Sequence, residues 1–247
     1  LNAHKINAGE LITLDNKNKD FFFFEKKDVR SVMGALVYLV KTRLPEYIGA
    51  SPFETQVLTP MRKGELGVEH LNEVLQYYLN PASESKKEKE GRTGVFREGD
   101  KVMQVKNNYK LEWKITNAKG FSIEEGLGVF NGDMGIIKQI NTYSERITVV
   151  FDENREAEYP FSSLDELELA YAITIHKSQG SEYPAVVLPL LSGPPILCNR
   201  NLLYTAITRA QKCVAIAGRQ SMVEQMIHNE TEQKRYSGLN DCLKEGL

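Results

Sequence analysis

The chain has 247 residues and a nearly balanced charge, with 31 Lys and Arg residues, 33 Asp and Glu residues and a formal net charge of −2. This balance excludes a protein that binds nucleic acid through a uniformly basic surface, so any such site has to be a local basic groove. The length suits one large domain or two modest domains with a real hydrophobic core.

Three cysteines, Cys198, Cys213 and Cys242, lie far from one another and form no C-x-x-C pair. This spacing predicts neither a disulfide framework nor a zinc site, and we predict no metal ligands on this chain. No apolar run approaches the roughly 20 residues of a membrane span, and no basic-then-apolar leader begins the sequence. We therefore predict a cytoplasmic protein in a reducing environment, with no membrane association.

Hydrophobic patterning predicts alternating strands and helices over the first third of the chain. Phe21 to Phe24 form a continuous apolar run, typical of a strand buried on both faces. Apolar residues at spacings of three and four from Val29 to Val40 predict a helix, which Pro45 ends. The same reasoning predicts a strand at 56–59 and a helix from 68 to about 80.

The composition and the predicted structure change in the middle third of the chain. From Ala82 to Gly94 the composition shifts to Ser, Lys, Glu and Gly, which predicts a mobile, solvated loop. Short apolar runs separated by Asn, Gly and Asp turn signals then follow, a pattern typical of a small β-barrel. The predicted strands of this barrel are 101–105, 135–140, 147–151 and 156–159.

In the last third, Ala185 to Leu190 and Cys213 to Gly218 read as buried strands, with a helix at 201–207 between them. Ser221 and Glu224 have the spacing of a capping box, which predicts the start of another helix.

The stretch from Ile173 to Tyr183 gathers hydroxyl, imidazole, ammonium, amide and carboxylate side chains around Gly180, directly before a predicted buried strand. Thr, His, Lys, Ser and Gln can all donate hydrogen bonds to phosphate oxygens, and a glycine lets the backbone approach closely. The stretch therefore indicates a site for a polyanion. The alternative is an ordinary solvated loop.

Three segments resemble motifs of superfamily 1 DNA helicases in their RecD-like form. Thr174 to Glu182 resembles motif V, Leu203 to Ala210 resembles motif VI, and Val57 to Gly64 resembles motif IV. The resemblance implies an α/β fold, a RecA-like parallel sheet flanked by helices as in P-loop NTPases, with a small inserted SH3-like β-barrel. The implied divisions are 1–82 and 167–247 for the RecA-like domain and 83–166 for the barrel.

The loop G-x-x-x-x-G-K-[ST], which cradles nucleotide phosphates, is absent from the sequence. A helicase needs it, so the resemblance implies a C-terminal half whose ATP and Mg²⁺ are held mainly by an N-terminal RecA-like lobe. It also implies that Arg62 and Arg209 are catalytic arginines that reach this ATP, and that Gly180 and Glu182 lie toward the nucleotide. For both arginines, the alternative is an ordinary surface or salt-bridged residue.

By the same resemblance, Thr174, His176 and Ser178 contact the backbone of single-stranded DNA, although His176 has an alternative role as a structural residue of the loop. The barrel adds a DNA-binding surface that includes Lys106 and Asn108. Its Trp113 either stacks on bases or packs within the barrel, and both readings stay open.

These features predict the C-terminal motor lobe of an ATP-dependent DNA helicase that moves 5′ to 3′. The implied partners are single-stranded DNA, the N-terminal lobe of the same polypeptide and other subunits of a recombination or repair complex. The chain alone is expected to be inactive. The alternative is a nucleic-acid-binding or protein-docking module without ATPase activity. A conjugative relaxase-helicase and a superfamily 1 RNA helicase also stay open.

Overall fold

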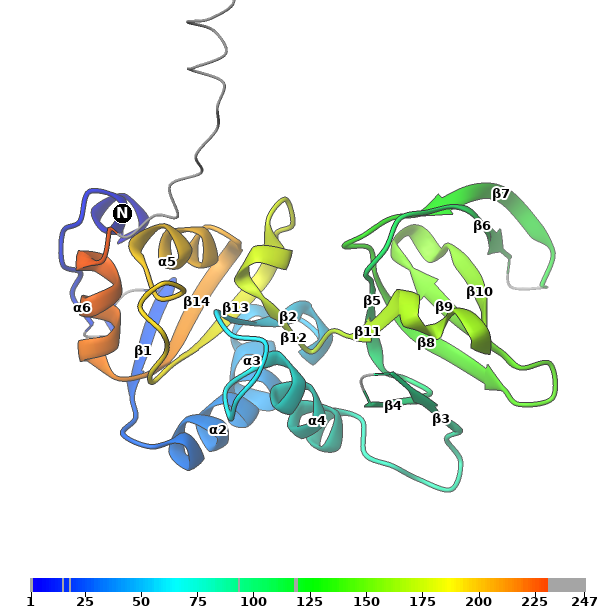
Figure 1. The fold of residues 1–247 in the computed structure, drawn as a ribbon, viewed down its shortest axis with the longest axis horizontal. Helices are drawn as coiled ribbons and strands as arrows, with labels where there is room; N and C mark the ends of the chain where they lie inside the picture. Colours follow the sequence, from blue (N-terminus) through cyan, green and yellow to red (C-terminus); the bar gives the residue numbers. More distant parts are fainter. Residues whose placement is uncertain (1, 15, 18, 93, 118–119, 231–247) are drawn as a thin grey trace, which may run out of the picture.

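The computed structural model describes residues 2–14, 16–17, 19–92, 94–117 and 120–230, so Cys242 lies outside the described residues. Two sheets dominate the fold: a five-stranded parallel sheet with helices on both faces, and a seven-stranded antiparallel sheet beside it (Figure 1). The predicted α/β class is confirmed. None of the described helices is long and apolar enough to cross a membrane.

The parallel sheet has a hydrophobic core on each face because its strands point successive side chains to opposite sides. In β13, for example, Val186 and Val187 belong to different buried clusters. One face packs against α2 (Val29–Tyr38), α3 (Leu44–Ile48) and α4 (Val68–Leu79), and the other against α1 (Asn2–Asn7), α5 (Arg200–Ile207) and α6 (Gln220–His228). The strand order is β1 (Phe21–Glu25), β14 (Ala210–Gly218), β13 (Tyr183–Leu190), β2 (Thr55–Thr59), β12 (Ala172–Thr174).

The strand predicted from four consecutive phenylalanines is confirmed as β1, but its burial on both faces is wrong. Phe21 and Phe23 are buried, whereas Phe22 and Phe24 are half-buried. Because β1 lies at the edge of the sheet, the helical layer covers its second face only in part. Phe22 instead meets the ring of Tyr47 edge-on, with centroids 5.3 Å apart.

The prediction that Pro45 ends the first long helix is also wrong. A π-helical turn, Leu39–Arg43, follows α2, and the Leu44 N–H donates to the carbonyl of Leu39, five residues back. This widened turn makes room for the proline ring, which then lies in the first turn of α3. The helix ends at Gly49, whose φ of 66° suits a glycine.

The antiparallel sheet confirms four predicted strands, β5 (Lys101–Gln104), β8 (Met134–Asn141), β9 (Arg146–Phe151) and β10 (Glu156–Pro160). Three further strands were not predicted: β6 (Asn108–Thr116) and β7 (Ser122–Val129) form a long hairpin at one edge, and β11 (Leu167–Leu169) pairs with β5 at the other. The chain thus leaves this sheet only after Leu169, and the predicted division at 166/167 stays a prediction.

The stretch from Ala82 to Gly94, predicted as a mobile loop, is partly ordered as a hairpin of β3 (Glu88–Gly91) and β4 (Gly94–Arg97). The Arg97 guanidinium pairs with the Glu88 carboxylate across the hairpin at 2.6 Å. The predicted capping box is wrong as well: α6 begins at Gln220, before Ser221, and its first N–H donates to Glu25 at 3.0 Å.

A buried polar network joins the two sheets at the start of β5. The Asp100 carboxylate accepts hydrogen bonds from Gln76 of α4, from Asn80 directly after α4, from the Tyr171 hydroxyl and from the Arg97 N–H, at 2.6–2.9 Å. Next to it, the Lys101 ammonium donates to the Phe53 carbonyl at 2.6 Å and to Gln56 Oε1 at 2.8 Å. The strand that opens the barrel is therefore anchored directly to the helical lobe.

Burial lowers the pKa of Lys101 from 10.5 to about 8. Between these two values the unfolded chain binds more protons at this group than the folded chain, so the Lys101 contribution to the free energy of unfolding rises with pH. Urea unfolding at pH 7.5 and 9.5 should show this rise in the wild type. A Lys101→Met variant, which cannot titrate here, should lose it; an equal pH dependence in both proteins would contradict the assignment.

Candidate functional site

Apart from Lys106 and Asn108 of the barrel, the residues predicted to bind ligands lie where the strands of the parallel sheet begin or end. We call the side where these strands begin the amino edge and the side where they end the carboxyl edge. Arg62 follows the carboxyl end of β2, whereas Arg209 directly precedes the first residue of β14. Val187 of β13 pairs with Val57 of β2 on one side and with Ala215 of β14 on the other, so these three residues lie at the same height in the sheet. The segment from Arg209 to Ala215 alone spans roughly 20 Å at about 3.3 Å per residue. The structure therefore does not bring Arg62 and Arg209 together, and the role of both arginines at one nucleotide stays a prediction.

At the amino edge, Arg209 is held by neutral groups. Its guanidinium donates to the Ser181 carbonyl at 3.2 Å, to the Thr205 carbonyl at 3.3 Å and to the Thr208 hydroxyl at 3.3 Å. The side chain is half-buried, and across the described part of the chain no carboxylate lies within 4.0 Å of it. Arg209 is thus a fixed cation that has no counter-ion among the described residues.

The structure brings Gly180 and Glu182 to the same edge. The Ser181 carbonyl binds Arg209, and the Tyr183 N–H donates to the Arg209 carbonyl at 2.8 Å, so the loop 180–182 runs beside the arginine. Gly180 is exposed, has a φ of 89° and has open space where a side chain would stand. Glu182 is exposed and accepts a hydrogen bond from Gln211 at 3.3 Å. Gly180, Glu182 and Arg209 can therefore contact the same ligand.

At the carboxyl edge, β12 ends in a short 3₁₀ turn, Ile175–Ser178. The Thr174 hydroxyl caps this turn by accepting from the Lys177 N–H at 3.3 Å, and His176 is exposed at its tip. Ser178 differs from the prediction, because its hydroxyl is fully buried and donates to the Ile175 carbonyl at 2.7 Å. Ser178 stabilises the turn in this conformation and does not present its hydroxyl to a ligand.

An ion cluster that the sequence did not predict lies at this edge. Glu168 of β11 accepts a hydrogen bond from Arg62 at 2.7 Å and another from Lys177 at 2.9 Å. Burial raises the pKa of Glu168, but the hydrogen bonds and positive charges of Lys177 and Arg62 together outweigh burial and hold that pKa below its usual value. Arg62 also faces Glu69 at 3.5 Å. Arg62 and the 175–178 turn are therefore joined through one carboxylate.

The predicted DNA-binding residues of the barrel are engaged by acidic partners. Lys106 pairs with Asp165, and the Asn108 amide donates to Glu166 at 2.9 Å. Trp113 packs over Gly126, with the Arg155 guanidinium 5.6 Å from its ring centroid, which favours the packing reading. Each of these two residues thus has an acidic partner, and the Lys106 side chain is still 55% exposed, so their DNA-binding role stays a prediction.

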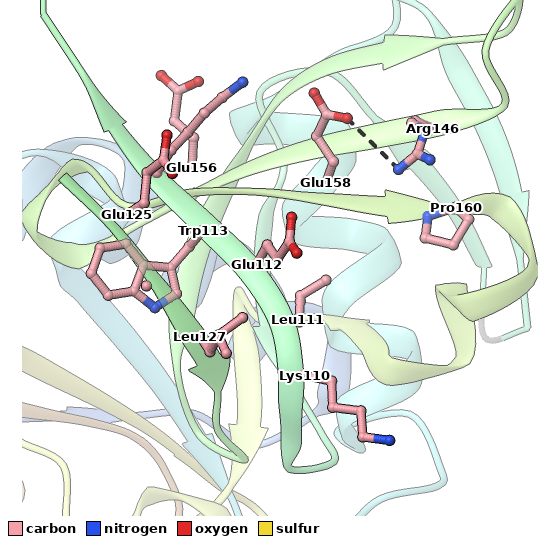
Figure 2. A pocket seen from close by; sticks show the side chains of 12 residues that line it. Lys110, Leu111, Glu112, Trp113, Glu125, Leu127, Arg146, Glu156, Glu158 and Pro160 are labelled. Carbon is pink, nitrogen blue, oxygen red and sulfur yellow. Dashed lines mark ion pairs between the residues drawn. The ribbon is translucent and has the colours of Figure 1, made fainter. Parts of the chain in front are cut away.

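A groove of about 660 Å³ lies beside Trp113. Its lining side chains come from β6, β7, β9 and β10 (Figure 2). Carboxylates outnumber cations among its lining side chains, so a phosphate backbone is not favoured there. The carboxylates belong to Glu112, Glu125, Glu156 and Glu158, and the cations to Lys110, Lys114 and Arg146. Across the described residues, no group of three or more His, Cys, Asp or Glu side chains could hold a metal ion.

Two family models match the chain. The SH3 domain of ATP-dependent RecD-like DNA helicases matches residues 71–151, and the UvrD-like helicase C-terminal domain matches residues 169–217. The first match confirms the predicted SH3-like nature of the inserted barrel.

Curated relatives agree with these matches. An ATP-dependent RecD2 DNA helicase of Deinococcus radiodurans is 39% identical over 167 residues, which cover 68% of this chain and 20% of the relative. A RecBCD enzyme subunit RecD of Mycolicibacterium smegmatis is 30% identical over 191 residues, 77% of this chain and 29% of the relative. The chain thus spans under a third of either relative.

Among solved structures, a Pif1 helicase from Bacteroides in complex with ADP-AlF3 and ssDNA is similar to this chain at 17% identity and a TM-score of 0.47. The alignment covers 99% of this chain and 52% of the Pif1 chain. The two family matches and the curated relatives name one group of proteins. The chain therefore belongs to the RecD-like DNA helicases, and it carries their SH3 domain followed by a UvrD-like helicase C-terminal domain.

Proposed function

We propose that the chain is the C-terminal motor lobe of an ATP-dependent DNA helicase and that it supplies Arg209 to ATP. In this proposal the nucleotide and its Mg²⁺ are held mainly by an N-terminal RecA-like lobe of the full-length protein. The observation that carries the proposal is the half-buried Arg209 guanidinium, which neutral acceptors fix in place and which has no carboxylate within 4.0 Å in the described chain. The names of the two relatives, a DNA helicase and a RecBCD subunit, support it.

The chemistry of the amino edge suits this role. A guanidinium stays charged and offers forked donors, so it can stabilise the charge that spreads over the γ-phosphate oxygens in the transition state. Gly180 leaves space for the nucleotide, and Glu182 suits a ribose hydroxyl better than a phosphate because like charges repel. The residues 1–82 and 167–247 would form this lobe and 83–166 the barrel.

The carboxyl edge is the proposed site of single-stranded DNA. Thr174 and His176 lie there, and we move Arg62 from the nucleotide to this edge because it sits beside the 175–178 turn. Cations and hydroxyls there can bind backbone phosphates without reading the bases.

Movement from 5′ to 3′ and assembly with other subunits of a recombination or repair complex remain part of the proposal.

ATP hydrolysis tests whether the N-terminal lobe is needed to bind the nucleotide while this chain supplies Arg209. Residues 1–247 alone should hydrolyse no ATP above the buffer background, because the phosphate-binding loop is absent from their sequence. The full-length protein should hydrolyse ATP, and faster when single-stranded DNA is added. Turnover by the isolated chain would contradict the proposal. A full-length protein that binds DNA but never hydrolyses ATP would favour the nucleic-acid-binding or docking module.

A further inference from the structure

The carboxylate of Glu168 binds two cationic side chains at the proposed strand-binding edge. Each of its oxygens accepts one hydrogen bond, Oε1 from Arg62 and Oε2 from Lys177. The Glu168 side chain is only 16% exposed, whereas those of Arg62 and Lys177 are 44% and 31% exposed. Two oxygens of a backbone phosphate could accept the same two donors from the solvent side.

Glu168 is fixed in place by its strand. Its neighbours Leu167 and Leu169 are buried, so alternation along β11 turns Glu168 to the opposite side, toward the parallel-sheet lobe. β11 pairs with β5, and Asn72 of α4 donates to the carbonyls of Leu169 and Ala172 at 3.0 Å. The carboxylate can therefore not withdraw far when its partners leave. The two cationic side chains are longer and more exposed, so they are the members that can turn toward a phosphate.

The charges of this cluster cancel. Arg62 and Lys177 contribute two positive charges, and Glu168 and Glu69 contribute two negative ones. A cation that is already paired releases fewer counter-ions when it meets a phosphate, so its net contribution to DNA affinity is small. The edge thus carries potential phosphate ligands that are held neutral within the protein.

We propose that Glu168 is a built-in competitor for the DNA backbone, which holds Arg62 and Lys177 when no strand is bound and so limits the affinity of this edge. The inference rests on the proposed function, since it takes the carboxyl edge as the strand site. A backbone phosphate has to replace the carboxylate at one or both cations, and the carboxylate takes them back when the strand moves on. A motor that steps along DNA needs such a reversible grip.

The test is a Glu168→Gln variant of the full-length protein without nucleotide. The amide keeps the size of the side chain but carries no charge, so Arg62 and Lys177 become available to phosphates. Fluorescence anisotropy with an oligothymidylate should show roughly tenfold tighter binding at low salt. A plot of log Kd against log salt concentration should steepen by about 0.7 for each freed cation.

Matched variants separate this effect from a general change in charge or fold. Glu46→Gln, an exposed carboxylate of α3, changes the net charge equally and should leave both affinity and salt slope nearly unchanged. Adding Arg62→Gln to Glu168→Gln should remove much of the gain, because the freed arginine supplies it. Glu168→Asp, whose shorter side chain reaches the cations less well, should tighten binding by less and serves if the glutamine variant unfolds.

Unchanged or weaker DNA binding by a folded Glu168→Gln protein, with an unchanged salt slope, would overturn the proposal while leaving Arg209 and the motor function untouched. A wild-type protein that binds no single-stranded DNA would overturn the strand site itself, and with it this inference. A gain that survives the loss of Arg62 and also appears in Glu46→Gln would show bulk charge as its cause and overturn the role of Glu168.

Discussion

Replacing Arg209 by alanine in the full-length protein is expected to lower DNA-stimulated ATP turnover at least about 100-fold. The guanidinium is held at the amino edge by the carbonyls of Ser181 and Thr205, so the variant removes the charge without removing a buried ion pair. The KM for ATP should change little, because the proposed contact acts mainly on the transition state. Steady-state hydrolysis with and without single-stranded DNA measures both quantities.

Two variants serve as controls for Arg209→Ala. Arg219 lies at the other end of β14 and donates to the Lys27 carbonyl at 2.7 Å, so Arg219→Ala removes an arginine from the same strand and should leave turnover nearly unchanged. Arg209→Lys keeps the charge but loses the forked donors and should recover only part of the activity. Equal turnover in wild type and Arg209→Ala would remove Arg209 from the mechanism.

Asp100→Asn is expected to lower the free energy of unfolding by about 3 kcal/mol, because four donors converge on this carboxylate and an amide group would face two of them. Burial raises the pKa of Asp100, and the hydrogen bonds from Asn80, Gln76 and Tyr171 limit that rise. The loss should appear in urea unfolding of the chain. It should loosen the barrel from the helical lobe, since Gln76 belongs to α4 and Asn80 is the C-cap of that helix.

The control for Asp100→Asn is Asp165→Asn. Asp165 is also a paired aspartate at the barrel, but its side chain is 43% exposed and its partner Lys106 is 55% exposed. Surface pairs contribute little to stability, so this variant should unfold almost as the wild type does. Similar stability of the two variants would show that the Asp100 network does not hold the barrel to the lobe.

Several elements followed from local patterns alone. β2, α4 and β13 were predicted because buried parallel strands and amphipathic helices have strong periodic signals. The hairpin of β6 and β7 was missed although Lys110 to Ile115 alternates polar and apolar residues, which is a usable strand signal. That segment was interpreted as a DNA-binding or packing surface of the barrel, and no strand was assigned to it.

Other errors needed tertiary information. Pro45 is tolerated because a π-helical turn precedes it, and no local rule placed that turn there. The start of α6 is set by Glu25, a residue far away in the sequence. The hairpin of β3 and β4 forms in a stretch of mixed charge whose composition alone indicates a solvated loop.

The candidate site shows the same limit. Sequence motifs selected Arg209, Gly180 and Glu182, and the fold brings these residues to one edge. The motifs could not show that Arg62 stands at the opposite edge, because this depends on strand direction and register. Glu168 was missed because it belongs to β11, a three-residue strand between the predicted barrel and the polar stretch. Its role depends on cations 106 residues upstream and 9 residues downstream.

The most direct test of the central claim compares the binding of ADP and of ADP with aluminium fluoride, a mimic of the transferring phosphoryl group, to full-length wild type and Arg209→Ala. The account predicts that the variant binds ADP within about threefold of wild type but loses about 100-fold in affinity for the aluminium fluoride complex. Equal affinities of the two proteins for that complex would contradict the claim that this lobe supplies Arg209 to the transition state.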